Sequence, residues 1–277
     1  MSSKGRIRHA DVNKPYVNFV FQQICAVLME YSPEQTCAIG VMAKAPQAGR
    51  SKTRLCPPLR PEQAAALSAA FLSDTTHNLA AAARAVPIAP YAAYAPLGAE
   101  QVLAPHLARG TAMVLADGSP TMPAGVDGFG RCLLHAVLGM LACGHEAACV
   151  LSSDIPTLPT CRLIEAAERM LAPGERAVLG ATHDGGYYLL GLKAPHAQMF
   201  ADIAWSTASV AEATRARARD LGLDLVELEP WYDIDDAASL GTLTADLAGY
   251  AAPATRAVLA QLGLGCETLK PRMEMRA

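Results

Sequence analysis

Four basic side chains lie close to one glycine in residues 42–55, directly after a short apolar run. They are Lys44, Arg50, Lys52 and Arg54, around Gly49. Lysine and arginine neutralise phosphate charge, and glycine allows a ligand to approach the backbone closely. A P-loop is excluded, because Ser51 and Pro46 occupy positions where that motif needs glycine. A phosphate-binding loop is favoured over an ordinary solvated basic loop, the other interpretation of these residues.

Two acidic segments follow apolar runs of strand length, and we expect their carboxylates to bind a metal. Asp154, preceded by Ser153, comes after residues 147–151, and Asp235 comes after residues 224–228. Ligands of open α/β sheets bind beyond the carboxyl ends of strands, and Mg²⁺ or Mn²⁺ prefers oxygen ligands there. Capping of the following helix is the alternative for Ser153 or Asp154. Asp235 is preferred to Asp233 as the ligand because it lies nearer the next helix.

Two further segments are candidates for binding the substrate. They contribute Asp184, Gly185, Gly186 and Tyr187 from the first, and Ser206 and Thr207 from the second. The two glycines would let a substrate lie against the backbone, although Asp and Gly also form ordinary tight turns. Ser206 or Thr207 is expected at the start of a helix, where it either caps the helix or contacts an anion.

The elements that must position these residues alternate along the chain. Strands are predicted at 37–42, 88–94, 112–116, 147–151, 176–181, 187–192 and 224–228. Helices are predicted from Pro61 and over 129–142, 160–171, 208–221 and 236–247. This alternation indicates an α/β sheet with helices on both faces. The strands 176–181 and 187–192 are joined through His183-Asp-Gly-Gly186, a link too short for a helical crossover, which predicts a hairpin and therefore a mixed sheet.

The alternating pattern divides the chain into a central domain, residues 37–249, an N-terminal extension, residues 1–36, and a helical C-terminal extension, residues 250–277. Residues 1–36 carry several apolar side chains, which suit either a homodimer interface or a packed extra helix. Their apolar part is interrupted by Asn18, Gln22 and Gln23, so neither a signal peptide nor a membrane span is predicted.

Composition narrows the class of protein. The net charge of −3 argues against nucleic acid as the main partner. The eight cysteines form no CxxC pair and several lie in apolar runs, so we expect buried thiols in a reducing, cytoplasmic compartment.

Five motifs in this order resemble a known family. They are Ala43–Leu55, Ser153-Asp-Ile-Pro156, Asp184-Gly-Gly-Tyr187, Trp205-Ser-Thr207 and Asp233-Ile-Asp235. Together they resemble the glycosyltransferase-A-like family of the nucleotide-diphospho-sugar transferase superfamily, which is related to 2-phospholactate guanylyltransferases and molybdenum-cofactor nucleotidyltransferases. The resemblance implies a three-layer α/β/α sandwich with a mostly parallel, mixed sheet and with the nucleotide over the first loop. It also implies that Lys52 and Arg54 hold phosphates and that Asp154 and Asp235 hold the metal.

The expected function is therefore metal-dependent nucleotidyl transfer. A nucleoside triphosphate would donate its nucleotide to a small molecule that bears a phosphate or phosphonate, and pyrophosphate would leave. Lys52, Arg54 and Asp154 are the predicted catalytic residues, while Lys44, Gly49 and Ser153 complete the predicted phosphate site. Glycosyl transfer from a nucleotide-diphospho-sugar is the first alternative, since the same fold and metal site serve it. Non-catalytic nucleotide binding is the second.

Overall fold

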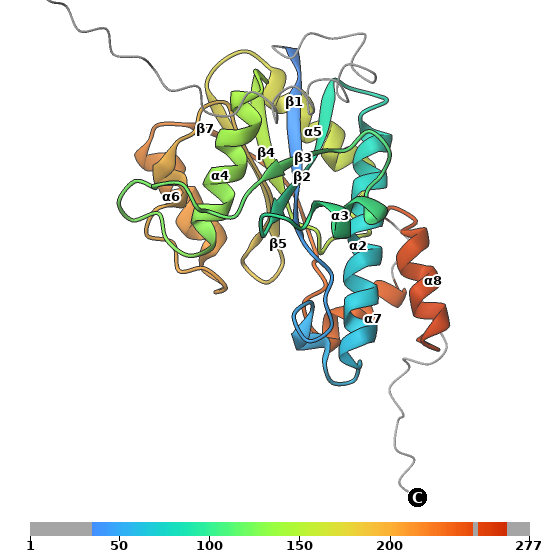
Figure 1. The fold of residues 1–277 in the computed structure, drawn as a ribbon. Helices are drawn as coiled ribbons and strands as arrows, with labels where there is room; N and C mark the ends of the chain where they lie inside the picture. Colours follow the sequence, from blue (N-terminus) through green and yellow to red (C-terminus); the bar gives the residue numbers. More distant parts are fainter. Residues whose placement is uncertain (1–34, 246–248, 265–277) are drawn as a thin grey trace, which may run out of the picture.

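A computed structural model describes residues 35–245 and 249–264 (Figure 1). Its strands are β1 (Cys37–Lys44), β2 (Ile88–Ala95), β3 (Ala112–Leu115), β4 (Ala147–Leu151), β5 (Arg176–Thr182), β6 (Tyr187–Leu192) and β7 (Asp224–Trp231). Its α-helices are α2 (Pro61–Ala82), α3 (Glu100–Leu103), α4 (Phe129–Ala142), α5 (Thr160–Leu171), α6 (Val210–Asp220), α7 (Ala237–Ala245) and α8 (Pro253–Gln261). Three short 3₁₀ helices are η2 (Thr53–Leu55), η3 (Ala104–His106) and η4 (Ala197–Phe200).

The strands form one seven-stranded sheet in the order β3-β2-β1-β4-β6-β5-β7. All of its neighbouring pairs are parallel except the two that involve β6, which is antiparallel to β4 and β5. The predicted mixed, mostly parallel sheet and the predicted hairpin between β5 and β6 are therefore confirmed.

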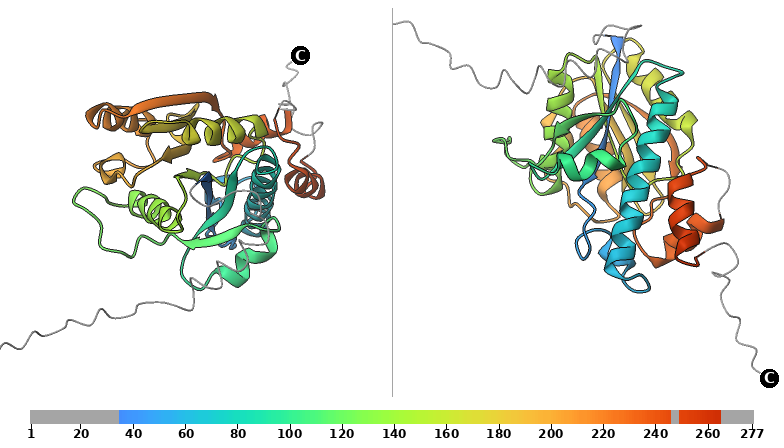
Figure 2. Two further views of the ribbon diagram at one scale, coloured as in Figure 1. Left: turned by 90° about the horizontal axis from the view of Figure 1, so that it is seen from above. Right: turned by 45° about the vertical axis from the view of Figure 1, so that its right-hand side comes forward.

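Helices cover both faces of the sheet and bury two apolar layers, as the sequence predicts. Leu72 and Leu79 of α2 and Leu163 of α5 pack with Ile39 and other strand residues on one face. On the opposite face, Leu133, Val137 and Met140 of α4 pack with Tyr91 and Leu190. Figure 2 shows α2 and α4 on opposite sides of β1. This arrangement is the predicted three-layer α/β/α sandwich.

The structure corrects some predicted element ends. The last strand continues from the predicted end at 228 to Trp231, although it contains Pro230. Strand β7 is at the edge of the sheet, where a proline without an N–H group breaks no necessary ladder bond. The helix predicted from residue 208 begins at Val210.

The strand order reverses between β1 and β4, since β2 and β3 extend to one side and β6, β5 and β7 to the other. At such a point the connections leave in opposite directions and open a crevice beyond the carboxyl ends of the strands. Lys44 ends β1, and Ser153 and Asp154 follow β4 by two and three residues. The fold therefore brings the basic loop and the first acidic segment to the same crevice.

A third apolar cluster extends the fold beyond the sheet. Leu67 and Phe71 of α2 pack there with Leu240 and Leu243 of α7 and Leu259 of α8, and Figures 1 and 2 show α2 and α8 side by side. Helix α8 lies in the predicted C-terminal extension. The predicted N-terminal extension falls almost wholly outside the described residues. No helix in the described parts of the chain has both the length and the apolar character needed to cross a membrane.

The buried carboxylate of Asp74 in α2 holds the start of α8. Its two oxygens accept hydrogen bonds from the backbone N–H groups of Ala254, at 3.0 Å, and Thr255, at 2.7 Å. We expect Asp74→Ala to lower the free energy of unfolding by about 3 kcal/mol, because it leaves two helix N–H groups without their charged acceptor. Urea denaturation measures this change. Asp74→Asn, which keeps one acceptor oxygen, should lose less, and equal stability of all three proteins would contradict the anchoring role.

Candidate active site

The basic loop after β1 is closed by its own polar groups. Backbone N–H groups of Arg50 and Ser51 donate to Gln47 O, and Ser51 Oγ accepts from Gln47 N at 3.0 Å. Gly49 has a φ of +75°, a left-handed value that favours glycine. It is not among the residues that line the cleft described below, so its turn explains it without a ligand. The turn places Arg50 and Lys52 along the cleft.

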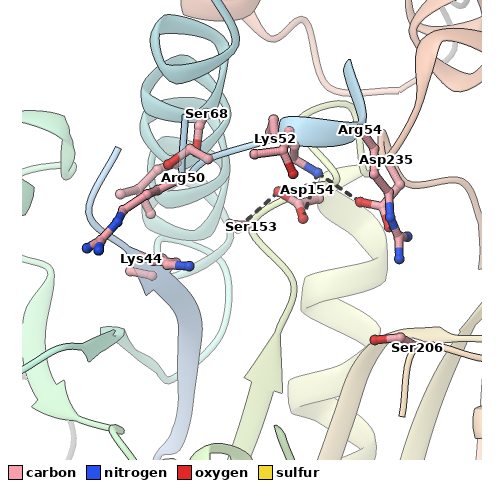
Figure 3. A pocket seen from close by; sticks show the side chains of 13 residues that line it. Lys44, Arg50, Lys52, Arg54, Ser68, Ser153, Asp154, Ser206 and Asp235 are labelled. Carbon is pink, nitrogen blue, oxygen red and sulfur yellow. Dashed lines mark hydrogen bonds and ion pairs between the residues drawn. The ribbon is translucent and has the colours of Figure 1, made fainter. Parts of the chain in front are cut away.

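Lys52 lies between the two predicted metal ligands (Figure 3). Its ammonium Nζ is 2.7 Å from Asp154 Oδ2 and 2.9 Å from Asp235 Oδ1, and it donates a hydrogen bond to Ile234 O at 2.5 Å. The Lys52 side chain is only 7% exposed. Burial alone would lower the pKa of Lys52, but the two carboxylates outweigh it and raise that pKa. Lys52 is therefore a charged, nearly buried partner of both carboxylates.

Main-chain contacts hold the two carboxylates together. The backbone N–H of Ile234 donates to Asp154 O at 2.9 Å, joining the segment after β4 to the segment after β7. Ser239 Oγ accepts from the backbone N–H of Asp235 at 3.0 Å. Asp236 accepts from the backbone N–H of Ser239, as expected for a helix cap. Asp154 does not cap a helix, since α5 begins only at Thr160.

Apart from Gly49, the remaining predicted phosphate-binding residues lie around Asp154 and Asp235. Arg54 is 68% exposed, and its Nη1 atom is 3.6 Å from Asp235 Oδ2. Lys44, Arg50, Arg54 and Ser153 line a recess of about 310 Å³ together with Asp154 and Asp235. Figure 3 shows Lys44 and Arg50 apart from Lys52, on the other side of Asp154 from Asp235. Three cations other than Lys52 thus line the recess.

The recess shares many lining residues with a larger cavity of about 800 Å³, so the two form one cleft. The larger cavity brings in four of the six predicted substrate residues in addition to Ser206, which also lines the recess; these four are Asp184, Gly186, Tyr187 and Thr207. Part of the lining of this cavity is apolar and aromatic, including Phe129, Leu133 and Trp205. Trp205 makes edge contacts with Phe129 and Tyr187, with ring centroids 5.9 Å and 6.5 Å apart.

Gly185 is the predicted substrate residue that does not line the cleft. Its φ is +93°, and a Cβ atom there would lie 2.0 Å from the backbone oxygen of Ala208. Its carbonyl accepts a hydrogen bond from the N–H of Ala211 at 2.9 Å. The close approach that the sequence assigned to a substrate is made by the chain itself, and it packs the β5–β6 turn against the start of α6.

Polar side chains of the two predicted substrate segments also form hydrogen bonds within the protein. Asp184 Oδ1 accepts hydrogen bonds from Thr182 Oγ1 and from the backbone N–H of Gly186. Thr207 Oγ1 donates to Ala204 O at 2.7 Å rather than capping α6. Ser206 has a φ of +64° in the turn before that helix. The contacts fix Asp184 and Thr207 at the edge of the cleft.

The structure adds residues that the sequence analysis did not select. Asp233 lines the larger cavity, where burial, together with the charges of Asp184, Asp235 and Asp154, raises the pKa of Asp233 to about 6. Trp205 and Phe129 supply the aromatic wall. Trp205 lies inside a motif already noted, but its role as a wall follows only from its contacts with Tyr187 and Phe129.

Comparison with known proteins supports the fold. A family described as "Uncharacterized protein conserved in bacteria (DUF2064)" matches residues 76–207. A solved structure from Desulfovibrio desulfuricans G20, provisionally described as a nucleotide-diphospho-sugar transferase, superposes with a TM-score of 0.69 at 23% identity, covering 83% of this chain and 96% of that one. CMP:2-keto-3-deoxy-manno-octonic acid synthetase complexed with CTP gives a TM-score of 0.47 at 13% identity, with 82% and 99% coverage. No curated protein matches the chain significantly.

These comparisons support the fold of the protein. The Desulfovibrio structure shares the α/β fold over nearly its whole length. The likeness to the synthetase is weaker, with a TM-score of 0.47.

Proposed function

We propose that this protein is a metal-dependent nucleotidyltransferase. The observation that carries the proposal is that two carboxylates from separate strand ends converge on one cation position beside a loop with three further cations. A triphosphate needs such a combination, because its phosphate oxygens require both a divalent metal and fixed positive charge. The cleft is also large enough to hold a second, small molecule beside the nucleotide.

The carboxylates fit the metal that the proposal requires. Asp154 Oδ2 and Asp235 Oδ1 lie within 2.7 Å and 2.9 Å of a single atom, Lys52 Nζ, so they already face a common point. Among the described residues no group of three or more His, Cys, Asp and Glu side chains is arranged to hold a metal ion, so a metal here would have two protein carboxylates as ligands. Two carboxylates suit Mg²⁺ or Mn²⁺ bound with substrate phosphates, since such ions keep several water and phosphate ligands. The metal would neutralise charge on the phosphate oxygens.

The reaction is a displacement at the α-phosphorus. An anionic phosphate or phosphonate oxygen of the acceptor forms a bond to the α-phosphorus, while the bond from that phosphorus to the bridging oxygen breaks and pyrophosphate leaves. The attacking oxygen carries no proton, so the residues need no general base. Arg54 and Lys52 would stabilise the charge on the leaving pyrophosphate, and Lys44 would bind phosphate at the recess.

Glycosyl transfer from a nucleotide-diphospho-sugar is the second candidate. The provisional description of the Desulfovibrio protein favours it, and the same carboxylates would serve the diphosphate of such a donor. The cluster of basic residues favours the triphosphate, which carries more charge to neutralise. The third interpretation, nucleotide binding without catalysis, predicts binding and no turnover.

A ligand screen tests the proposal. The four nucleoside triphosphates and the common nucleotide sugars are each added with and without Mg²⁺ or Mn²⁺, and thermal unfolding is followed. We expect one triphosphate to stabilise the protein in a metal-dependent way, by about 2.7 kcal/mol at 100 times its dissociation constant. Pyrophosphate release is then measured with phosphate- and phosphonate-bearing acceptors. Stabilisation by nucleotide sugars alone would replace the proposal with glycosyl transfer, and binding without any turnover would support the non-catalytic interpretation.

A further inference from the structure

The ammonium group of Lys52 has no hydrogen left for a phosphate. It has three hydrogens, and three oxygens surround it: those of Asp154, Asp235 and Ile234. To contact a phosphate group in the recess, Lys52 must leave at least one of these partners. The predicted role of Lys52 as a phosphate ligand and the predicted metal site therefore compete for the same atoms.

The carboxylates do not need Lys52 to stay close together. The hydrogen bond from Ile234 N–H to Asp154 O joins their two segments through main-chain atoms, and Ser239 fixes the backbone of Asp235. If the ammonium leaves, two negative charges remain aimed at one point. This arrangement is unfavourable without a replacement cation and favourable with one.

The surroundings determine what can draw Lys52 away. Lys44, Arg50 and Arg54 line the same recess as Lys52, and like charges repel a further ammonium group. An anion bound among these cations would instead attract the ammonium group of Lys52. The lysine side chain has four flexible methylene groups, so its charge can move without a change in the fold.

We propose that Lys52 is a built-in counterion that occupies the divalent-metal position until a phosphate group bound among Lys44, Arg50 and Arg54 draws it away from the carboxylates. The ammonium and the metal then exclude one another between Asp154 and Asp235, and phosphate binding and metal binding strengthen each other. This inference rests on the proposed function for the nature of the phosphate ligand. The exclusion itself is a property of the protein and the metal alone, and by linkage each ligand must raise the affinity of the other by the same factor.

The test measures binding of Mn²⁺ alone, by electron paramagnetic resonance of free Mn²⁺ and by isothermal titration calorimetry. Wild-type protein is compared with Lys52→Met, which keeps a long apolar side chain but removes the charge. We expect Lys52→Met to bind one Mn²⁺ at least about tenfold more tightly than wild type, without any nucleotide. Lys52→Met combined with Asp235→Asn should lose this gain. Lys193→Met is the matched control, because Lys193 is also an ion-paired, nearly buried lysine, with Glu146 as its partner, and should bind like wild type.

Thermal unfolding provides a second measurement if Lys52→Met folds poorly. Its midpoint should fall without metal and recover when Mn²⁺ is added, whereas the wild-type midpoint should change little. Equal Mn²⁺ affinity in wild type and Lys52→Met would overturn the inference, as would a gain that survives Asp235→Asn. Because no nucleotide is present, a negative ligand screen would count against the proposed function and leave this result standing.

Discussion

Replacing Asp154 by asparagine is expected to lower turnover of the preferred triphosphate by about 10²- to 10³-fold, the scale for losing one preorganised electrostatic group. The substitution removes a predicted metal ligand and one of the two carboxylates that pair with Lys52, at 2.7 Å. The amide is nearly the same size, so the loss should come from charge. Steady-state release of pyrophosphate measures it, with the main effect on kcat because the metal acts on the reacting phosphates.

Asp236→Asn is the matched control for that experiment. Asp236 lies next to Asp235, but its side chain faces solvent and accepts hydrogen bonds from Ser239 at the start of α7. The same chemical change there should alter stability slightly and leave turnover within about twofold. If Asp154→Asn folds normally and retains wild-type turnover, the assignment of this cleft as the active site is wrong.

Gly185→Ala is expected to lower the free energy of unfolding by at least about 3 kcal/mol. The new Cβ would lie 2.0 Å from Ala208 O, and both groups belong to backbone that cannot rotate away. The left-handed φ of +93° adds a cost of about 1–2 kcal/mol for any residue with a Cβ. Denaturation in urea measures the change in stability, and turnover should fall as well because the turn carries Asp184 and Tyr187.

Gly222→Ala separates the steric clash from the conformational cost of a left-handed φ. Gly222 also has a left-handed φ, +66°, but nothing lies within 4 Å of the position its Cβ would take. It should therefore cost only the conformational part, about 1 kcal/mol, and leave turnover unchanged. Similar losses in the two variants would show that contact between the β5–β6 turn and the segment before α6 contributes little.

Much of the fold follows from the sequence because the strands are buried. Continuous apolar runs such as Cys37–Met42 and Ala147–Leu151 mark buried central strands, and the short link His183–Gly186 requires a hairpin. Strand β7 is harder to predict to its end. It is a half-exposed edge strand with a proline, so its apolar pattern ends before its hydrogen bonding does.

The neighbourhood of the site also follows from the sequence, but its pairing does not. Parallel strands end at one edge of the sheet, which is why Asp154 and Asp235 could be expected near Lys52. The sequence cannot show that Lys52 turns toward carboxylates that follow it by 102 and 183 positions. A basic residue beside a glycine predicts affinity for anions, and its direction depends on tertiary contacts. For the same reason Gly185 suggested a substrate contact, although its neighbour is Ala208.

The hydrogen bond between Ile234 and Asp154 has a mechanical consequence. It joins segments after β4 and β7, and these strands are separated in the sheet by β6 and β5. Three strand spacings of about 4.8 Å each lie between them, so the hydrogen bond connects distant strands across one edge of a twisted sheet. A change in the twist would strain this hydrogen bond and increase the distance between the two carboxylates. The affinity of the two carboxylates for a cation is thus coupled to the twist of the whole sheet. Slow exchange of the Ile234 amide proton would show that this hydrogen bond is intact.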